Sequence, residues 1–334
     1  MNFMLDFPVV SPEPRIKYED RLLLTGSCFT EHIGHSLANL KFNTLQNPNG
    51  ILFDPRSVAY SLVSYTQNRQ YTTDDLFYLN ELWHSWQHHS IFSDTDKYEC
   101  VRKINDSQDK AHGFLKSANW LLITLGSSFS YHVKEPGLPY GGGVANCHRA
   151  PAQWFNKHMM TIEEINIELD NCIHQLFQFN PSLKIIFTVS PVRHIRDGVT
   201  ENNRSKARLI EVVHHLVNKF AGIYYFPAYE LVIDVLRDYR FYDIDLVHPN
   251  YQATQFVLDK FMQYFVSDES QRLAGEVQKI VTARNHKPFQ SETEAHRRFL
   301  QSNYERTLAI QEKYPFIDMT EELLYFSNKE SNGV

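Results

Sequence analysis

The sequence is poor in cysteine and has no long apolar run. Four cysteines occur among 334 residues, none of them in a Cys-x-x-Cys pair, which disfavours a disulfide scaffold and a zinc ribbon. A membrane-spanning helix needs roughly 18 or more consecutive apolar residues, and no such stretch is present. The N-terminus lacks a basic segment followed by an apolar one, so no signal peptide is visible. We therefore expect a cytoplasmic protein that does not enter membranes.

Positive charge is also in short supply. The chain has 33 basic and 39 acidic residues, for a net charge of −6. A protein that binds nucleic acid needs a basic surface for the phosphate backbone, so we expect no nucleic-acid partner. The P-loop pattern is absent, and no Gly-x-Gly-x-x-Gly segment follows a strand pattern. The sequence thus predicts no nucleotide cofactor, and we expect no metal site either.

The chain does have the composition of an ordinary globular protein. Hydrophobic residues make up 43% and charged residues 22%, and aromatic residues are frequent, with 23 Phe and 18 Tyr. Its length is compatible with one or two domains, either of which can bury a substantial core.

Apolar runs alternate with helical patterns over most of the chain. Phe29, Ile33, Leu37 and Leu40 recur at helical spacing just after the first run. Such alternation predicts parallel strands joined by right-handed crossover helices. We therefore predict an α/β fold, a three-layer α/β/α sandwich around a parallel sheet. The predicted buried strands are residues 21–25, 120–125, 182–189 and 223–226.

The character of the sequence changes near residue 267. Residues 1–266 carry the α/β pattern, with an aromatic-rich insertion near 71–100, whereas residues 267–334 show only polar helical patterns. We interpret the second segment as a helical C-terminal extension. Its apolar stripe must pack against the α/β core, against a second subunit in a homodimer, or over the rim of a cleft.

Two motifs carry the residue types of nucleophilic catalysis. Ser27 follows the first strand directly, where ligands bind in open parallel sheets. Asp245 precedes His248 by three residues in a loop after the last strand. This spacing allows the carboxylate to orient the imidazole, which then accepts the proton of an attacking serine. Taken singly, Ser27 can equally be a helix N-cap and His248 a solvated side chain.

The order of these motifs resembles the SGNH, or GDSL-like, hydrolase superfamily. Residues 25–30, Thr-Gly-Ser-Cys-Phe-Thr, resemble the signature of the GSCFA domain family, with Thr30 in place of the alanine in the family name. The resemblance covers about residues 20–265. Other segments look like the same family in the same order: 47–50, 124–127, 145–148, 190–194 and 236–249.

The resemblance implies the flavodoxin-like fold of SGNH hydrolases and an ester-cleaving activity, with a carbohydrate O-acetyl ester as one candidate substrate. Carried over by position, Ser27 is the nucleophile, His248 the base and Asp245 its orienting acid. The oxyanion hole is then formed by the backbone N–H groups of Ser27 and Gly50. This chain reads Gly126-Ser127-Ser128 where the superfamily has an asparagine. Either Ser128 or another group donates there, or Asn146 reaches in from the following loop as the side-chain donor.

Several interpretations stay open at this stage. Ser128, Arg193, His194 and His89 are candidate substrate-binding residues; for Arg193 and His194 the alternative is a structural ion pair, and for His89 a hydrogen-bonded structural role. The same fold can also serve as a non-catalytic binding module. An O-acyltransferase that uses the same three catalytic residues is another alternative. The expected partner is a small-molecule or glycan ester.

Overall fold

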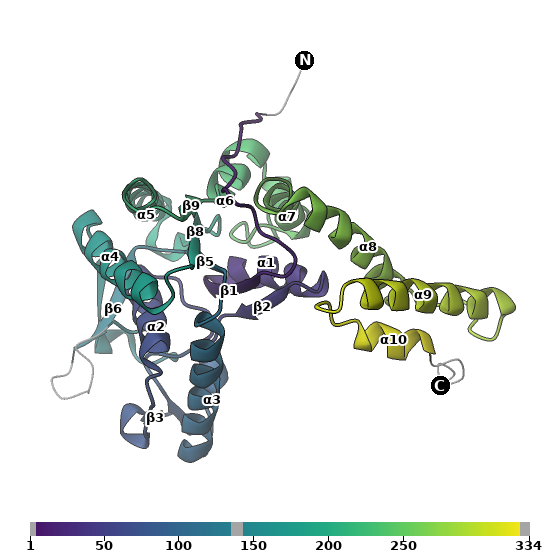
Figure 1. Ribbon diagram of the computed structural model, residues 1–334. Coiled ribbons are helices and arrows are strands. Elements are labelled where there is room, and N and C mark those ends of the chain that lie inside the picture. Colours follow the sequence, from purple (N-terminus) through teal and green to yellow (C-terminus); the bar gives the residue numbers. More distant parts are fainter. Residues whose placement is uncertain (1–4, 135–142, 328–334) are drawn as a thin grey trace.

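The computed structural model describes residues 5–134 and 143–327. Its centre is a five-stranded sheet in the order β2-β1-β5-β8-β9 (Figure 1). Every pairing in this sheet is parallel, and its central strands are buried on both faces, which explains their continuous apolar runs. The predicted α/β class is confirmed. The strands are β1 (Arg21–Gly26), β2 (Asn43–Gln46), β5 (Trp120–Leu125), β8 (Lys184–Val189) and β9 (Ile223–Tyr225).

Helices cover both faces of the sheet, as the three-layer prediction requires. Side chains along β1 alternate: Leu22 and Leu24 join one apolar cluster and Leu23 joins the other. The helices packed on the Leu22 face are α1 (Cys28–Asn39), the short α6 (Ala228–Glu230) and α7 (Tyr251–Phe265). The helices packed on the Leu23 face are α2 (Pro55–Gln67), α3 (Lys97–Leu115), α4 (Ile162–Phe179) and α5 (Val199–Lys219).

The strand order reverses direction at β1. From β1 the chain first moves outward to β2, and then crosses to β5 on the other side of β1. Ligands of open α/β sheets bind at such a switch point, outside the carboxyl ends of the strands. The end of β1 is therefore the place where the topology alone predicts a binding site.

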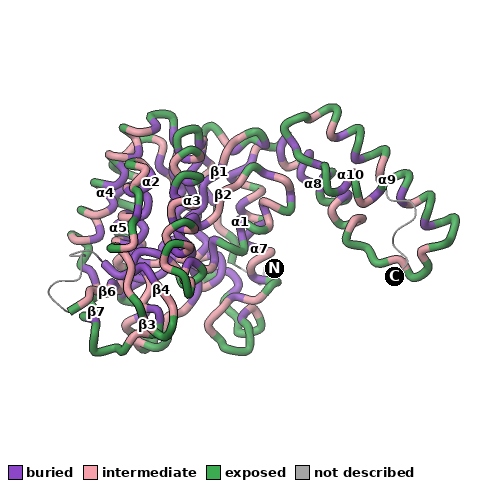
Figure 2. The backbone as a smooth tube through the Cα atoms, turned by 90° about the horizontal axis from the view of Figure 1, so that it is seen from below, coloured by how far each residue is buried: buried purple, intermediate pink, exposed green. Residues whose placement is uncertain are grey.

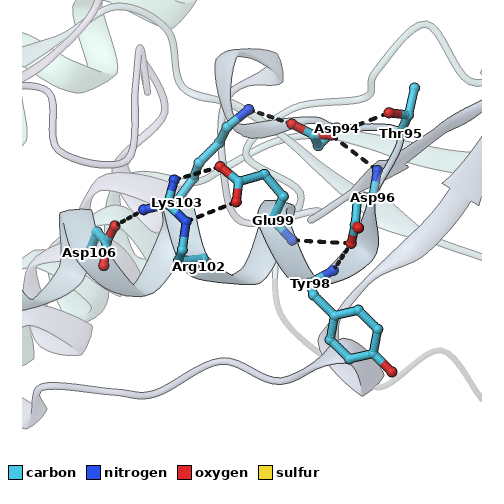
Figure 3. A network of polar contacts seen from close by, with 8 residues as sticks. All are labelled: Asp94, Thr95, Asp96, Tyr98, Glu99, Arg102, Lys103 and Asp106. Carbon is cyan, nitrogen blue, oxygen red and sulfur yellow. Dashed lines mark hydrogen bonds and ion pairs between the residues drawn. The ribbon is translucent and has the colours of Figure 1, made fainter.

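Two antiparallel hairpins extend the sandwich. The aromatic-rich insertion contains β3 (Phe77–Leu79) paired with β4 (Leu82–His84). Polar contacts at the start of α3 anchor it, because Asp94 binds Lys103 (Figure 3). The backbone of Asp94 also pairs with that of Trp83 on β4. The second hairpin, β6 (Phe129–Val133) with β7 (Phe155–Met159), was not predicted from the sequence.

Three helices follow the α/β core: α8 (Asp268–Arg284), α9 (Glu294–Lys313) and α10 (Thr320–Ser327). They extend from one side of the sandwich (Figures 1 and 2). Their apolar residues, such as Val277, belong to the same cluster as the Leu22 face of the sheet. The buried carboxylate of Glu322 binds Lys41 at 2.9 Å and Arg284 at 2.8 Å. The apolar stripe thus packs on its own core, and the homodimer stays a prediction.

Candidate active site

Ser27 lies directly after β1, at the switch point. Gly26, with φ of +140°, makes the turn possible, because a Cβ there would lie 2.2 Å from the carbonyl oxygen of Thr124. Ser27 occupies the N-cap position of α1, yet its side chain makes no capping hydrogen bond. Its hydroxyl is buried and has no partner. The Ser27 side chain therefore does not cap α1, which the sequence left open.

Asp245 and His248 form a close pair in the loop before α7. Asp245 Oδ2 lies 2.6 Å from His248 Nδ1, and Asp245 Oδ1 accepts the N–H groups of Val247 and His248. The hydrogen bond from the His248 side chain, helped by those two N–H groups, lowers the pKa of Asp245 to about 2. An ionised Asp245 requires the proton of a neutral His248 to sit on Nδ1, which leaves Nε2 as an acceptor.

A short chain of contacts links the two motifs. A Cβ built on Gly126 would lie 3.4 Å from Ser27 Cβ and 2.8 Å from Phe53 Cβ. The Phe53 ring lies 5.5 Å from the His194 ring. Arg193, the residue before His194, donates its backbone N–H to the carbonyl of Val247, the residue before His248. The structure thus places Ser27 and His248 at the same edge of the sheet, although no hydrogen bond joins Ser27 Oγ to His248 or to any other described group.

Arg193 supports the loop that carries the pair. Its backbone N–H donates to the carbonyl of Val247 at 3.2 Å. Its guanidinium donates to the carbonyl of Leu246 and lies 4.1 Å from the Tyr242 ring centroid. Among the described residues it makes no ion pair with a carboxylate. The structure therefore gives Arg193 a contact with the loop of His248, and its role toward a substrate stays a prediction.

The predicted oxyanion donors lie in hydrogen-bonded turns. The N–H of Ser27 donates to Thr124 O at 3.1 Å, and that of Gly50 donates to Asn47 O at 2.7 Å. Asn146 Oδ1 accepts the N–H of His148 at 2.8 Å, so the amide side chain of Asn146 is held in a turn. Both backbone donors are thus already engaged in this state, and their catalytic role stays a prediction.

Ser128 and His89, the other candidate substrate-binding residues, lie in different surroundings. Ser128 is fully buried and its hydroxyl has no partner. His89 is half-buried, and burial lowers the pKa of its imidazole. A Cβ built on Gly50 would lie 2.1 Å from the Cβ of His89. His89 therefore borders the Gly50 turn, whereas Ser128 is closed off from solvent.

Asn47 is a candidate site residue that the sequence did not distinguish from its neighbours. Its Oδ1 accepts the N–H of Gly26 at 2.9 Å, directly before Ser27. Its Nδ2 is buried and has no hydrogen-bond partner. An unpaired amide donor next to the candidate nucleophile is what an oxyanion hole requires. The only sequence signal was the Asn-Pro-Asn-Gly turn of residues 47–50.

Lys206 is a second residue that sequence reasoning missed. It lies on α5 and is 1% exposed, and its Nζ donates to the carbonyls of Gly126 and Ser190, both at 2.6 Å. These carbonyls follow β5 and β8, so Lys206 ties two strand ends together beneath the candidate site. Burial lowers the pKa of Lys206 to about 7.

Replacing Lys206 with methionine should therefore change how stability depends on pH. The pKa of Lys206 is about 7 in the folded chain and returns to its ordinary value of 10.5 on unfolding. Between these values the unfolded chain binds more protons, so stability rises with pH. We compare the free energy of unfolding of the wild type with that of Lys206→Met at each pH. The difference, wild type minus variant, should increase by up to about 1.4 kcal/mol for each pH unit between about pH 7 and 9.

Urea unfolding at several pH values measures this difference. Lys110→Met removes an exposed lysine of α3 and should track the wild type across the same range. If the difference in free energy of unfolding between wild type and Lys206→Met stays constant with pH, the pKa of Lys206 is not lowered in the folded chain.

Two kinds of feature were not found in the part of the chain that the structure describes. No three His, Cys, Asp or Glu side chains converge there in a way that would hold a metal ion. No helix among residues 5–134 and 143–327 is long and apolar enough to cross a bilayer.

Comparison with known proteins finds distantly similar solved structures and two matching family models. No curated protein matches the sequence. Among solved structures, the carbohydrate esterase family 3 from Talaromyces cellulolyticus matches with a TM-score of 0.37 and 8% identity, over 78% of this chain and 99% of that chain. The Clostridium thermocellum family 3 carbohydrate esterase matches with a TM-score of 0.35 and 11% identity, over 78% of this chain and 100% of that chain.

The family models match both parts of the sequence. The model of the GSCFA domain protein, C-terminal domain, matches residues 277–332, which include the C-terminal part of α8 and all of α9 and α10. The model of the GSCFA family matches residues 21–261, from the start of β1 into α7. Because the second match spans most of the sequence, including Ser27, Asp245 and His248, the chain belongs to the GSCFA family.

Proposed function

We propose that this protein is a serine hydrolase that cleaves an ester bond, with Ser27 as nucleophile, His248 as general base and Asp245 as the residue that orients His248. One observation carries the proposal. The hydroxyl of Ser27 is buried and unpaired at the switch point of the sheet, at the edge where the Asp245–His248 pair also lies. A ligand carbonyl that reaches this edge would meet a nucleophile and a base.

The proposed reaction has two balanced steps. Ser27 Oγ attacks the carbonyl carbon of the ester while His248 Nε2 takes the hydroxyl proton. The tetrahedral intermediate collapses to an acyl-serine, and His248 returns the proton to the departing alcohol. Water then attacks the acyl-serine by the same sequence, which releases the acid and restores the Ser27 hydroxyl. No cofactor takes part in this proposal.

Two side-chain amides are the proposed partners of the oxyanion. Asn146 is proposed as the substitute for the superfamily asparagine, and Asn47 adds an unpaired Nδ2 on the side chain that binds the Gly26 N–H. Backbone N–H groups of Ser27 and Gly50 complete the proposed hole once the oxyanion competes for their present hydrogen bonds. Donors are effective when they lie about 3 Å from the developing negative charge.

Loss of either amide should slow turnover. Asn146→Ala removes the Asn146 amide, which lies between β6 and β7. Asn47→Asp keeps an oxygen that can accept the Gly26 N–H but removes the Nδ2 hydrogens. We expect each to lower kcat by about 10²- to 10³-fold with little change in KM. Steady-state hydrolysis of p-nitrophenyl acetate measures the effect. If both variants keep the wild-type kcat, neither Asn47 nor Asn146 stabilises the oxyanion through its side-chain amide.

The same assay tests the function itself. Wild-type protein should release p-nitrophenol from p-nitrophenyl acetate well above the buffer rate. A binding module on this fold would give no release. An O-acyltransferase would instead move the acetyl group to an added alcohol, so analysis of the products distinguishes transfer from hydrolysis.

A further inference from the structure

The side of α5 that faces the sheet carries three buried polar side chains. α5 packs against β8 and β9 (Figure 1), and Asn202, Ser205 and Lys206 are 5%, 2% and 1% exposed. Ser205 and Lys206 follow Asn202 by three and four positions, so the three share one face of the helix. An apolar residue is the usual occupant of such a face, as Leu209 is on the next turn. We call the three residues the α5 polar patch.

Lys206 connects the ends of two neighbouring strands. β5 and β8 pair as far as Leu125 with Val189. Beyond these residues, Lys206 Nζ donates to the carbonyl of Gly126 and to that of Ser190, both at 2.6 Å. These two hydrogen bonds therefore set the separation of the two chain segments at the point where the pairing of the strands stops.

The other two residues of the patch bind the same two segments. Ser205 Oγ accepts the N–H of Ser128 at 2.7 Å and lies 3.2 Å from Ser127 Oγ. Asn202 Oδ1 accepts the N–H of His194 at 2.9 Å. The patch thus holds residues 126–128, which follow β5, and residues 190–194, which follow β8.

The segment after β5 adjoins the candidate nucleophile. A Cβ built on Gly126 would lie 3.4 Å from Ser27 Cβ. The N–H of Ser27 donates to the carbonyl of Thr124, two positions before Gly126. The N–H groups of Gly126 and Ser127 donate to the carbonyl of Phe53 at 2.7 and 3.1 Å. A shift of this segment would therefore change the contacts around Ser27.

The segment after β8 supports the loop of the candidate base. Arg193 belongs to this segment, and its backbone N–H donates to the carbonyl of Val247 at 3.2 Å. Its guanidinium donates to the carbonyl of Leu246 at 3.4 Å. Both carbonyls lie in the turn between Asp245 and His248. The place of His248 therefore depends on where this segment is held.

We infer that the α5 polar patch positions Ser27 and His248 relative to each other, with Lys206 as the link between the two halves of the site. This inference rests on the proposed esterase function and adds three positioning residues, which act through Gly126 and Arg193. Proton transfer requires Ser27 Oγ and His248 Nε2 to come within about 3 Å of each other. A small shift between the two segments therefore lowers kcat and leaves binding of the ester nearly unchanged.

Lys206→Met tests the link, because methionine fills the space but has no N–H to donate. With p-nitrophenyl acetate we expect kcat, expressed per folded molecule, to fall by about 10²-fold, as a misplacement of about 1 Å can cause. KM should stay within about twofold of the wild type. Lys219→Met removes the exposed lysine at the end of α5 and should keep wild-type kcat. A role in stability alone would lower the folded fraction but not kcat per folded molecule.

A pair of substitutions at Asn202 supplies the conservative variant. Asn202→Asp keeps an oxygen for the N–H of His194, and its carboxylate lies near the N-terminus of α5, where the helix dipole favours negative charge. Asn202→Leu removes the acceptor at similar volume. We expect Asn202→Leu to lower kcat by about tenfold or more and Asn202→Asp to restore most of it. Asn218→Leu, at an exposed asparagine of α5, should match the wild type.

Hydrogen exchange tests the inference without a substrate. Lys206 binds the carbonyls of Gly126 and Ser190, whereas residues 243–250 lie beyond Arg193 in the chain of contacts. Lys206→Met should speed amide exchange in residues 243–250 by about tenfold or more, and Lys219→Met should leave it unchanged. Mass spectrometry of peptides from the exchanged protein gives these rates.

The outcomes separate this inference from the proposed function. In an active enzyme the inference requires both the lower kcat of Lys206→Met and the faster exchange in residues 243–250, and either result without the other overturns it. If the wild type hydrolyses no ester, the esterase proposal fails. Faster exchange in residues 243–250 of Lys206→Met then still supports the link through α5, and an unchanged rate there contradicts it.

Discussion

Ser27→Ala should reduce ester turnover by at least about 10³-fold, as removal of a triad nucleophile does in general. The physical reason is that, in the proposed reaction, the Ser27 hydroxyl forms the bond to the carbonyl carbon, and alanine has no atom that can do so. The neighbouring thiol of Cys28 does not substitute, since burial raises its pKa and favours the unreactive thiol form. The measurement is kcat with p-nitrophenyl acetate.

The fold should survive this substitution. The Ser27 hydroxyl makes no hydrogen bond, so its removal leaves no partner unpaired. Ser128→Ala is the matched control, because it also removes a buried, unpaired serine hydroxyl, and its effect on kcat should be milder. Wild-type turnover in a well-folded Ser27→Ala protein would exclude Ser27 as nucleophile.

Asp245→Asn should be nearly as damaging, with kcat lowered by about 10³- to 10⁴-fold. Asparagine keeps an oxygen for the N–H groups of Val247 and His248, so the loop should hold its shape. Its NH₂ group would face His248 Nδ1 and force the ring proton onto Nε2. His248 could then no longer accept the proton of Ser27.

Asp243→Asn is the control for this variant. Asp243 is an exposed carboxylate two positions before Asp245 in the same loop, so Asp243→Asn removes the same negative charge. Its contact with His248 is a backbone hydrogen bond, from the Asp243 N–H to the His248 carbonyl. It should retain wild-type kcat. A large loss in Asp243→Asn, or none in Asp245→Asn, would show that His248 does not depend on the Asp245 carboxylate.

The central strands could be predicted from sequence because burial on both faces imposes an uninterrupted apolar run. β1, β5 and β8 all carry that signal. The edge strand β2 is short and has no fully buried residue, so its sequence carries little information about pairing. The β6–β7 hairpin was missed because β7 is mostly exposed, with the polar sequence Phe-Asn-Lys-His-Met.

Within the candidate site, a side-chain contact could be predicted from the residues alone only where its two partners are close in sequence. Asp245 and His248 are three positions apart in the sequence, and their pairing follows from local geometry. Lys206 reaches Gly126 and Ser190 only because α5 packs beneath the strand ends. The contact of Asn47 with Gly26 likewise depends on the pairing of β2 with β1. Neither contact leaves a pattern in the sequence.

The most direct test of the proposed function is to react the wild-type protein with a fluorophosphonate probe and map the adduct by mass spectrometry. The proposal predicts a single covalent adduct on Ser27, no labelling of Ser27→Ala, and slow labelling of Asp245→Asn. An adduct on another residue, or ester hydrolysis that proceeds without any labelling of Ser27, would contradict it.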